Sequence, residues 1–321
     1  LHDYPCLMQE LLEVAPRRIL ALGTLPASVL CPGFDSLRED HGTLFFNPTL
    51  NAIVVPTFHF SAVARDPTKR DWMIRDLWRF ANLPNPTQPD YVLNDMENWE
   101  SEIAEKDLVC IDIETTSLDK VTGQIISFGF KAKEWHRALL VTDQKLIIPT
   151  LKKLRKVLIK TKSRIMGHNL LFDIDWIQHH TKESWLDIPH RDTMLMAHVA
   201  GEEVLALKHL TTIYTDRPGS RAFGGPNDQG YLAEDVFSTE EYYRDILCST
   251  GVNKAYASTI MNELVPYIIE MRNKGVKLDY KLLTKLFPQY KKAVADQVAY
   301  LNRLAKRSEE RRVGKECRSR W

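Results

Sequence analysis

The strongest constraint in the sequence is an apolar stretch, residues 108–114, that ends in two carboxylates. Side chains two residues apart on a strand share a face, so Asp112 and Glu114 lie on one face and apolar side chains fill the other. Neighbouring anions at the end of a buried strand repel each other unless a cation or a shared proton compensates them. A hard divalent ion such as Mg²⁺ prefers oxygen ligands. The pattern therefore predicts either a metal-binding strand end or an edge strand with one solvated face.

Composition excludes several classes of protein. Hydrophobic residues make up 44% and charged residues 26% of the 321 positions, which is typical of a globular chain with room for two domains. The net charge of +1 excludes a global basic field, so a nucleic acid would contact a local patch. The five cysteines are scattered without a Cys-x-x-Cys pair, which argues against a disulfide framework or a complete zinc site. No apolar run approaches membrane-spanning length and no signal peptide is expected. The chain begins inside an expected element, which predicts a fragment.

Two layers of secondary structure are expected, one on each side of a proline-rich segment. Before this segment, strands at 17–23 and 51–57 alternate with helices, which predicts a truncated parallel α/β layer. Residues 82–90 contain three prolines and predict a linker. Residues 95–105 predict a short acidic helix that leads into the central strand.

The second layer is expected to be a mixed sheet built around the 108–114 strand. Its other expected elements are antiparallel strands at 125–130 and 136–141, a helix at 151–160, a strand at 163–169 and a helix from Leu170. Three strands, a helix, a strand and a helix form the order of a ribonuclease H-like core. The fold class expected for the whole chain is therefore α/β, with this core preceded by the truncated layer.

Two acidic motifs carry a family resemblance. Residues 112–118 (Asp-Ile-Glu-Thr-Thr-Ser-Leu) and 167–173 (Gly-His-Asn-Leu-Leu-Phe-Asp) resemble motifs of the proofreading 3′–5′ exonuclease domain of family A (DNA polymerase I-like) DNA polymerases. These exonucleases are of the four-carboxylate DEDD type with a ribonuclease H-like fold. Their third motif needs a Tyr and an Asp four residues apart, which is one helical turn. Tyr231 and Asp235 have this spacing, and residues 270–279 resemble the entry to the polymerase domain.

Other placements of the third motif compete with this one. Tyr91 also has an Asp four residues later, but it precedes the first motif. Residues 247–252 have the rhythm of the motif without its functional side chains, and Asp245 lacks a Tyr four residues before it. We choose Tyr231 and Asp235, and Asp245 stays open as an alternative fourth carboxylate.

The resemblance implies a role for each motif residue. Two divalent ions, Mg²⁺ or Mn²⁺, would be held by Asp112, Glu114, Asp173 and Asp235. Tyr231 would orient the attacking water. The 3′ end of a single DNA strand would contact Thr115, Thr116, Leu118, Asn169 and Phe172. In the full-length protein this strand would come from primer–template DNA.

Structural roles are the alternative for several of these residues and their neighbours. Phe172 lies at helical spacing and would pack in the core. Asp192 would cap the helix that follows it. His168 and His209 would be hydrogen-bonded structural histidines. Asp175, on the same helix as Asp173, would be solvated.

The N-terminal layer resembles part of a uracil-DNA-glycosylase-type domain. The matching stretches are 19–23 and 54–63, in which His59 and Ser61 occupy a His-Pro-Ser motif with Phe60 as a departure. His59 would polarise a flipped base or simply form a hydrogen bond at the strand end. The family's water-activating loop would lie before the first residue of this chain. We therefore predict no glycosylase activity.

These resemblances divide the chain into five parts. They are a partial glycosylase-like domain (1–83), a linker (84–105), an exonuclease domain (106–265), the start of a polymerase domain (266–308) and a possibly non-native tail (309–321). The predicted function is proofreading exonuclease of a polymerase in the cytoplasm of a bacterial or phage-infected cell, with no membrane partner. The alternatives are a non-catalytic module that binds single-stranded nucleic acid and an RNA-trimming exonuclease.

Overall fold

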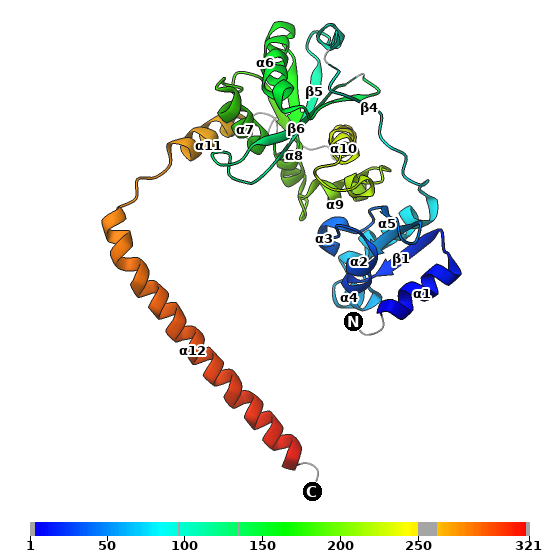
Figure 1. Ribbon diagram of the computed structural model, residues 1–321, viewed down its shortest axis with the longest axis vertical. Helices are drawn as coiled ribbons and strands as arrows, with labels where there is room; N and C mark the ends of the chain where they lie inside the picture. The colour runs from blue at the N-terminus through cyan, green and yellow to red at the C-terminus, as the bar shows by residue number, and fades with distance from the viewer. Residues whose placement is uncertain (1–3, 96, 134, 250–261, 319–321) are drawn as a thin grey trace. The chain divides into compact units, whose positions relative to one another are not determined.

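The computed structural model describes residues 4–95, 97–133, 135–249 and 262–318 (Figure 1). The chain divides into two compact units, Leu1–Ile269 and Glu270–Trp321. The strands are β1 (Arg18–Leu22), β2 (Phe45–Asn47), β3 (Ala52–Thr57), β4 (Tyr91–Leu93), β5 (Leu108–Thr115), β6 (Ile125–Ala132), β7 (Ala138–Val141), β8 (Arg164–Gly167) and β9 (His190–Asp192). The helices of the first unit are α1 (Tyr4–Val14), α2 (Thr24–Leu30), α3 (Leu37–Asp40), α4 (Phe60–Arg65), α5 (Lys69–Asn82), η1 (Trp99–Glu102), α6 (Gln144–Thr161), α7 (Leu170–Thr181), α8 (Thr193–Ala200), α9 (Leu207–Tyr214), η2 (Ser220–Phe223) and α10 (Gln229–Ser249). They are followed by α11 (Asn262–Lys274) and α12 (Tyr280–Arg318).

The N-terminal layer contains a three-stranded sheet in the order β1-β3-β2. β1 and β3 are parallel, as expected, but β2 pairs antiparallel with β3, so the sheet is mixed and the expectation of an all-parallel layer was wrong at this edge. The sequence hides β2 because it is three residues long and joined to β3 by a tight turn. Asn47 closes this turn by accepting a hydrogen bond from the Leu50 amide at 3.0 Å.

The second sheet has six strands in the order β4-β7-β6-β5-β8-β9. β5, β6 and β7 are antiparallel neighbours, and β8 and β9 continue parallel to β5. This arrangement confirms the predicted mixed α/β fold of the ribonuclease H-like type.

One strand of the second sheet was not expected. Residues 91–93, placed by sequence in the linker, form β4 and pair parallel with β7. The helix predicted over 95–105 is reduced to the short η1, where Trp99 is buried under the sheet. A short edge strand has too few residues for a two-residue alternation to be recognised.

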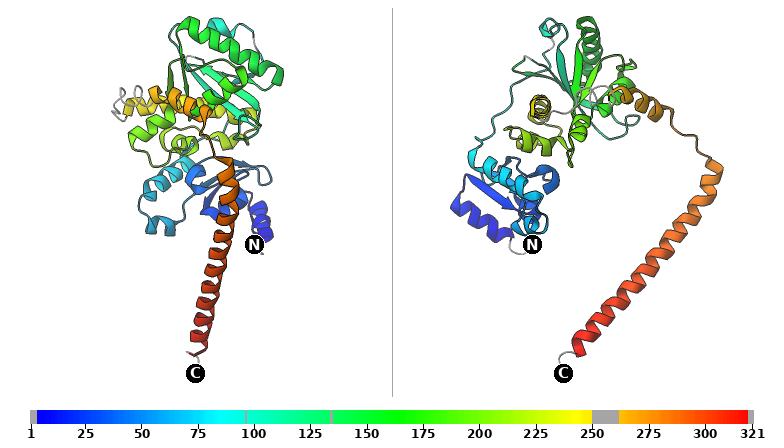
Figure 2. Two further views of the ribbon diagram at one scale, coloured as in Figure 1. Left: turned by 90° about the vertical axis from the view of Figure 1, so that its left-hand side faces the viewer. Right: turned by 180° about the vertical axis from the view of Figure 1, so that it is seen from behind.

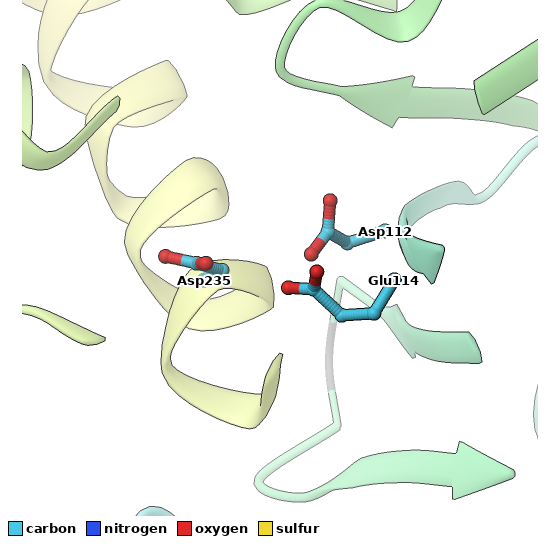
Figure 3. Close-up of side chains that lie close together, drawn as sticks. All are labelled: Asp112, Glu114 and Asp235. Atoms are coloured by element: carbon cyan, nitrogen blue, oxygen red, sulfur yellow. The ribbon is translucent and has the colours of Figure 1, made fainter. Parts of the chain in front are cut away.

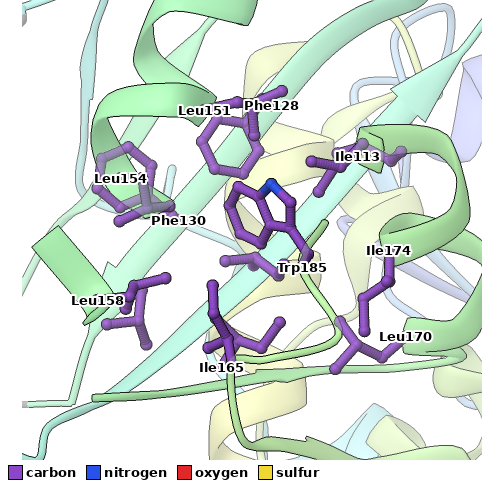
Figure 4. Packing of buried hydrophobic residues seen from close by; sticks show 14 of the residues in the cluster. Ile113, Phe128, Phe130, Leu151, Leu154, Leu158, Ile165, Leu170, Ile174 and Trp185 are labelled. Carbon is purple, nitrogen blue, oxygen red and sulfur yellow. The ribbon is translucent and has the colours of Figure 1, made fainter. Parts of the chain in front are cut away.

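Helices cover both faces of the second sheet (Figures 1 and 2). The odd-numbered residues 109, 111 and 113 of β5 belong to a core shared with α6 and α7, and Trp185 lies within it (Figure 4). The opposite face, which includes Cys110, packs against Leu232, Ala233 and Val236 of α10. The alternation of β5 therefore turns Asp112 and Glu114 toward α10, away from the larger core.

Gly129 allows α10 to approach the sheet closely. It lies directly opposite Asp112 in the β5–β6 pairing. A Cβ atom at Gly129 would lie 3.1 Å from Leu232 Cγ and 3.2 Å from Val236 Cγ2, two residues that flank Asp235 on α10. A side chain here would have to push this part of α10 outward.

The second unit consists of the end of α11 and the long α12. The backbone of α12 is helical to Arg318 and so continues into the predicted tail. Exposed apolar side chains such as Phe287 and Leu301 follow its length. Among the described residues, no helix is both long enough and apolar enough to cross a membrane.

We predict that Gly129→Ala lowers the free energy of unfolding by about 1–3 kcal/mol, because the added methyl group overpacks the contact between the sheet and α10. Urea denaturation measures the change. Gly225→Ala is the matched control, since a Cβ there meets nothing within 4 Å. Equal stability of the two variants would contradict the close packing of α10.

Candidate active site

Three carboxylates from two distant parts of the chain come together at the end of β5. Oxygen atoms of Asp112, Glu114 and Asp235 all lie within 4.8 Å of one another. Asp112 and Glu114 extend from β5 toward α10, which carries Asp235 (Figure 3). Of the sequence-predicted ligands, the structure thus gathers these three in one cluster.

The local structure explains why these three side chains meet. The pairing of β5 with β6 shifts register between Glu114 and Thr115, so the regular ladder ends where the carboxylates stand. On α10, Leu232 and Val236 are anchored in the core, which leaves Asp235 facing β5. The adjacent Glu234 points elsewhere and forms a bidentate ion pair with Arg217.

Burial and mutual repulsion raise the pKa values of the cluster. Burial, together with the charges of Asp173, Asp235 and Glu114, raises the pKa of Asp112 well above its ordinary value. Burial and the charge of Asp235 raise the pKa of Glu114 to about 8. Burial raises the pKa of Asp235 to about 7. Clustered oxygen donors with this excess of negative charge fit a hard divalent cation, because a cation would relieve both penalties.

Asp173 stands beside the cluster rather than within it. Its Oδ1 accepts a hydrogen bond from the Ile113 amide at 3.2 Å. This amide is accessible because β8 pairs with β5 only as far as Cys110. Burial raises the pKa of Asp173, and its charge in turn raises that of Asp112. Its role as the fourth metal ligand stays a prediction.

Tyr231 lies one helical turn before Asp235, as the spacing of the motif requires. Its side chain is 6% exposed, and burial raises its pKa above 10, so it carries its proton at neutral pH. Two cations flank its ring. Lys208 Nζ and Arg221 Cζ each lie 5.9 Å from the ring centroid.

The residues predicted to contact a nucleic acid lie around this cluster. Leu118 is 89% exposed in the turn after β5, so it is not part of the core. The side chains of Thr115 and Thr116 form hydrogen bonds within the same turn. Asn169 begins α7 in the left-handed conformation and Phe172 packs partly against the core beside Trp176.

Two neighbouring polar residues, Asp192 and His168, have the structural roles that the sequence analysis gave as alternatives. Asp192 caps α8 by accepting hydrogen bonds from the Met194 and Leu195 amides. His168 lies 2.8 Å from the Thr193 hydroxyl and 2.7 Å from the Leu205 carbonyl oxygen, and burial lowers its pKa to about 4.

The expectation that Asp175 is solvated was wrong. Its side chain is 4% exposed and pairs with Lys120. This ion pair joins α7 to the turn between β5 and β6, a contact across 55 residues that sequence spacing does not reveal.

His59 and Ser61 lie in the N-terminal layer and interact with each other. His59 precedes α4, and its Nδ1 accepts a hydrogen bond from the Ser61 amide at 3.1 Å. Both residues are exposed. This arrangement agrees with one of the two expected roles of His59, a hydrogen-bonded histidine at the strand end.

Sequence reasoning missed the two cations beside Tyr231. Arg221 lies in η2 within a Gly- and Pro-rich segment, and Lys208 lies on α9 next to a structural histidine. The side chain of the rival Asp245 lies outside the part of the chain that the structure describes.

A comparison with protein families matches the part of the chain that contains Asp112, Glu114 and Asp173. Residues 92–220 match the model of a family described as 3′-5′ exonuclease. The match begins within β4 and ends before Tyr231 and Asp235. This part of the chain is therefore similar to 3′–5′ exonuclease domains. No curated protein matches the chain.

Several solved structures are similar to the chain at low identity. One is an apo form of a nuclease, with 13% identity, a TM-score of 0.46 and coverage of 61% of this chain and 99% of that one. Another is NrnC of Brucella melitensis, with 16% identity, a TM-score of 0.42 and coverage of 58% and 93%. The catalytic core of RRP6 from Trypanosoma brucei has 11% identity, a TM-score of 0.41 and coverage of 58% and 55%.

The raised pKa values predict that the metal-free protein loses stability as the pH rises. Glu114 and Asp235 have folded-state pKa values of about 8 and about 7, above their ordinary values of 4.5 and 3.8. The folded state therefore holds more protons than the unfolded state from about pH 4 to pH 8, and the free energy of unfolding falls across that window. With a chelator present, we expect a lower Tm at pH 8 than at pH 5.

The Asp235→Asn variant tests the cause of this fall. It removes one of the repelling anions, so the decrease in Tm from pH 5 to pH 8 becomes smaller. Adding Mg²⁺ or Mn²⁺ at pH 8 raises the Tm of the wild-type protein and raises that of the variant much less. Asp71→Asn, an exposed change on α5, is the control. Identical pH profiles for all three proteins would refute electrostatic strain in the cluster.

Proposed function

We propose that this chain removes nucleotides from the 3′ end of single-stranded DNA by metal-dependent hydrolysis of the terminal phosphodiester. The observation that carries the proposal is the cluster of Asp112, Glu114 and Asp235, with Tyr231 one turn before Asp235 on α10. The match of residues 92–220 to a 3′-5′ exonuclease family supports it.

The side chains have distinct tasks in this reaction. Asp112, Glu114 and Asp235, with Asp173 beside them, would hold two Mg²⁺ or Mn²⁺ ions. Such ions lower the pKa of water and stabilise the negative charge on the leaving 3′ oxygen. The protonated Tyr231 hydroxyl would orient the attacking water.

The turn after β5 would bind the end of the strand. Leu118 is almost fully exposed there and would pack against the terminal base. An apolar contact of this kind reads single strands without sequence preference. Thr115, Thr116, Asn169 and Phe172 would complete the contact surface around it.

We further propose that the activity serves proofreading in a family A DNA polymerase. The support is the resemblance of residues 270–279 to the entry of the polymerase domain, followed by the exposed apolar side chains of α12. In this proposal the single strand arrives from primer–template DNA in the cytoplasm of a bacterial or phage-infected cell. Residues 1–83 would be a glycosylase-like layer without glycosylase activity.

The assay is the release of mononucleotides from a 3′-labelled single DNA strand in the presence of Mg²⁺ or Mn²⁺. We predict that Asp112→Asn lowers the rate at least about 10²-fold, because the cluster loses one of the carboxylates that would hold the metal ions, whose positive charge stabilises the transition state. Asp71→Asn, far from the cluster, is expected to retain full activity.

The same assay separates the alternatives. Release of nucleotides from RNA but not from DNA would replace the proposal with an RNA-trimming exonuclease. Binding of the strand without cleavage under either metal would identify a non-catalytic binding module. Full activity of Asp112→Asn would show that the assigned cluster is not the active site.

A further inference from the structure

A pair of cations stands beside the carboxylate cluster. Lys208, on α9, and Arg221, in η2, approach the ring of Tyr231 to the same distance, 5.9 Å from its centroid. Their charges reach the cluster, since both oppose the rise in the pKa of Glu114 and Asp235 that burial causes. They are therefore part of the electrostatic environment of the site.

Within the described part of the chain, Lys208 and Arg221 form no ion pairs with the carboxylates of the cluster. Among the described residues, the ion pair recorded for Arg221 is with Asp40, at 3.9 Å, and none is recorded for Lys208. Asp112, Glu114 and Asp235 form no ion pair with either cation within that same part of the chain. Lys208 and Arg221 thus lie next to three carboxylates without forming ion pairs with them. Their positive charges are available to bind an anion that enters the site.

Asp40, a residue of the N-terminal layer, holds Arg221 in position. Asp40, at the end of α3, is fully buried, and its Oδ2 accepts hydrogen bonds from the Asp35 and Ser36 amides. Its Oδ1 has no hydrogen-bond partner among the described residues and lies 3.9 Å from Arg221 Nε. Asp40 is thus held by the backbone just before α3, and its second oxygen faces the guanidinium group.

The same layer also fixes the segments that carry both cations. Arg79 is fully buried and donates hydrogen bonds to the carbonyl groups of Thr215 and Arg217, just before η2. His41 Nε2 lies 2.8 Å from Nδ1 of His209, the residue that follows Lys208 on α9. The positions of α9 and η2 relative to the cluster are therefore set by N-terminal residues.

We infer that Arg221 and Lys208 bind phosphate oxygens of the nucleic-acid strand at the active site, and that Asp40 is a positioning residue for Arg221. The inference rests on the proposed function, because it takes the substrate to be a phosphodiester. A guanidinium group suits this task, since it donates paired hydrogen bonds to phosphate and keeps its charge at all relevant pH values. Its role assigns the N-terminal layer a part in substrate binding.

A neutralising role is the competing explanation for the two cations. In that case Arg221 would only reduce repulsion among the carboxylates, and its removal would change the Mg²⁺ concentration needed for activity. A phosphate-binding role instead changes the affinity for the strand, including in a chelator, where no metal contributes.

The first experiment measures binding of a fluorescent single-stranded DNA to the full chain in EDTA over a range of salt concentrations. We expect Arg221→Ala and Lys208→Ala each to weaken binding roughly tenfold, as expected for loss of a hydrogen bond to a charged group. Each should also reduce the slope of log K against log salt by about 0.7, the value for one phosphate contact on a single strand. Arg70→Ala, an exposed arginine of the same layer, is the control and should change neither.

The second experiment tests positioning by a double-mutant cycle. Asp40→Asn keeps an oxygen acceptor for the Asp35 and Ser36 amides but removes the charge facing Arg221, so we expect a rise in KM with kcat nearly unchanged. In the Arg221→Ala background the same change should have no further effect on KM. Additive effects of the two changes would refute the positioning role. Unchanged strand binding and salt slope in Arg221→Ala and Lys208→Ala would refute the phosphate contacts.

The outcomes separate this inference from the proposed function. If the wild-type enzyme is active and Arg221→Ala changes neither KM nor strand binding, the exonuclease proposal stands and the inference is overturned. If the wild-type chain released no nucleotides but bound the strand through Arg221 and Lys208, the inference would stand and the exonuclease proposal would be overturned.

Discussion

The site depends on packing that forces like charges together. Asp112, Glu114 and Asp235 repel one another, since the charges of Asp235 and Glu114 raise the pKa of Asp112 and the charge of Asp235 raises that of Glu114. The contact of α10 with the sheet, made close by Gly129, supplies the opposing free energy. A cation bound at the cluster would relieve this repulsion, so the arrangement favours binding of a positive charge.

A second polar network joins the N-terminal layer to α9, which follows the six-stranded sheet in the chain. His41 lies 2.8 Å from both Asp76 and His209, and all three side chains are buried. Thr57 donates a hydrogen bond to the other oxygen of Asp76 at 2.6 Å. Buried polar groups are costly when their partners are lost, so separating the two parts would expose the network at once. The proline-rich segment between them thus connects parts that are also joined through space.

The sequence predicts the parts of this site that follow from local periodicity. The alternation of β5 placed Asp112 and Glu114 on one face, and the four-residue spacing of Tyr231 and Asp235 placed both on one turn of a helix. The ion pair of Asp175 with Lys120 was missed because its partner is 55 residues away. β2 and β4 were missed because three residues are too few to establish a period. The cations beside Tyr231 escaped for the same reason as Asp175, since only the tertiary fold brings α9 and η2 to α10.

The separation of cations from carboxylates has a chemical consequence. If Arg221 formed a close ion pair with Glu114, the carboxylate would be less available to a metal ion and the guanidinium group less available to a phosphate, and a buried pair gains little stability in return. Tyr231 is the residue that both cations flank, while Asp235 stands one turn further along the same helix. The ion pair of Arg221 with Asp40, outside the cluster, compensates its charge without using a carboxylate of the cluster. The N-terminal layer thereby lets opposite charges coexist in one site while each stays available for its own ligand.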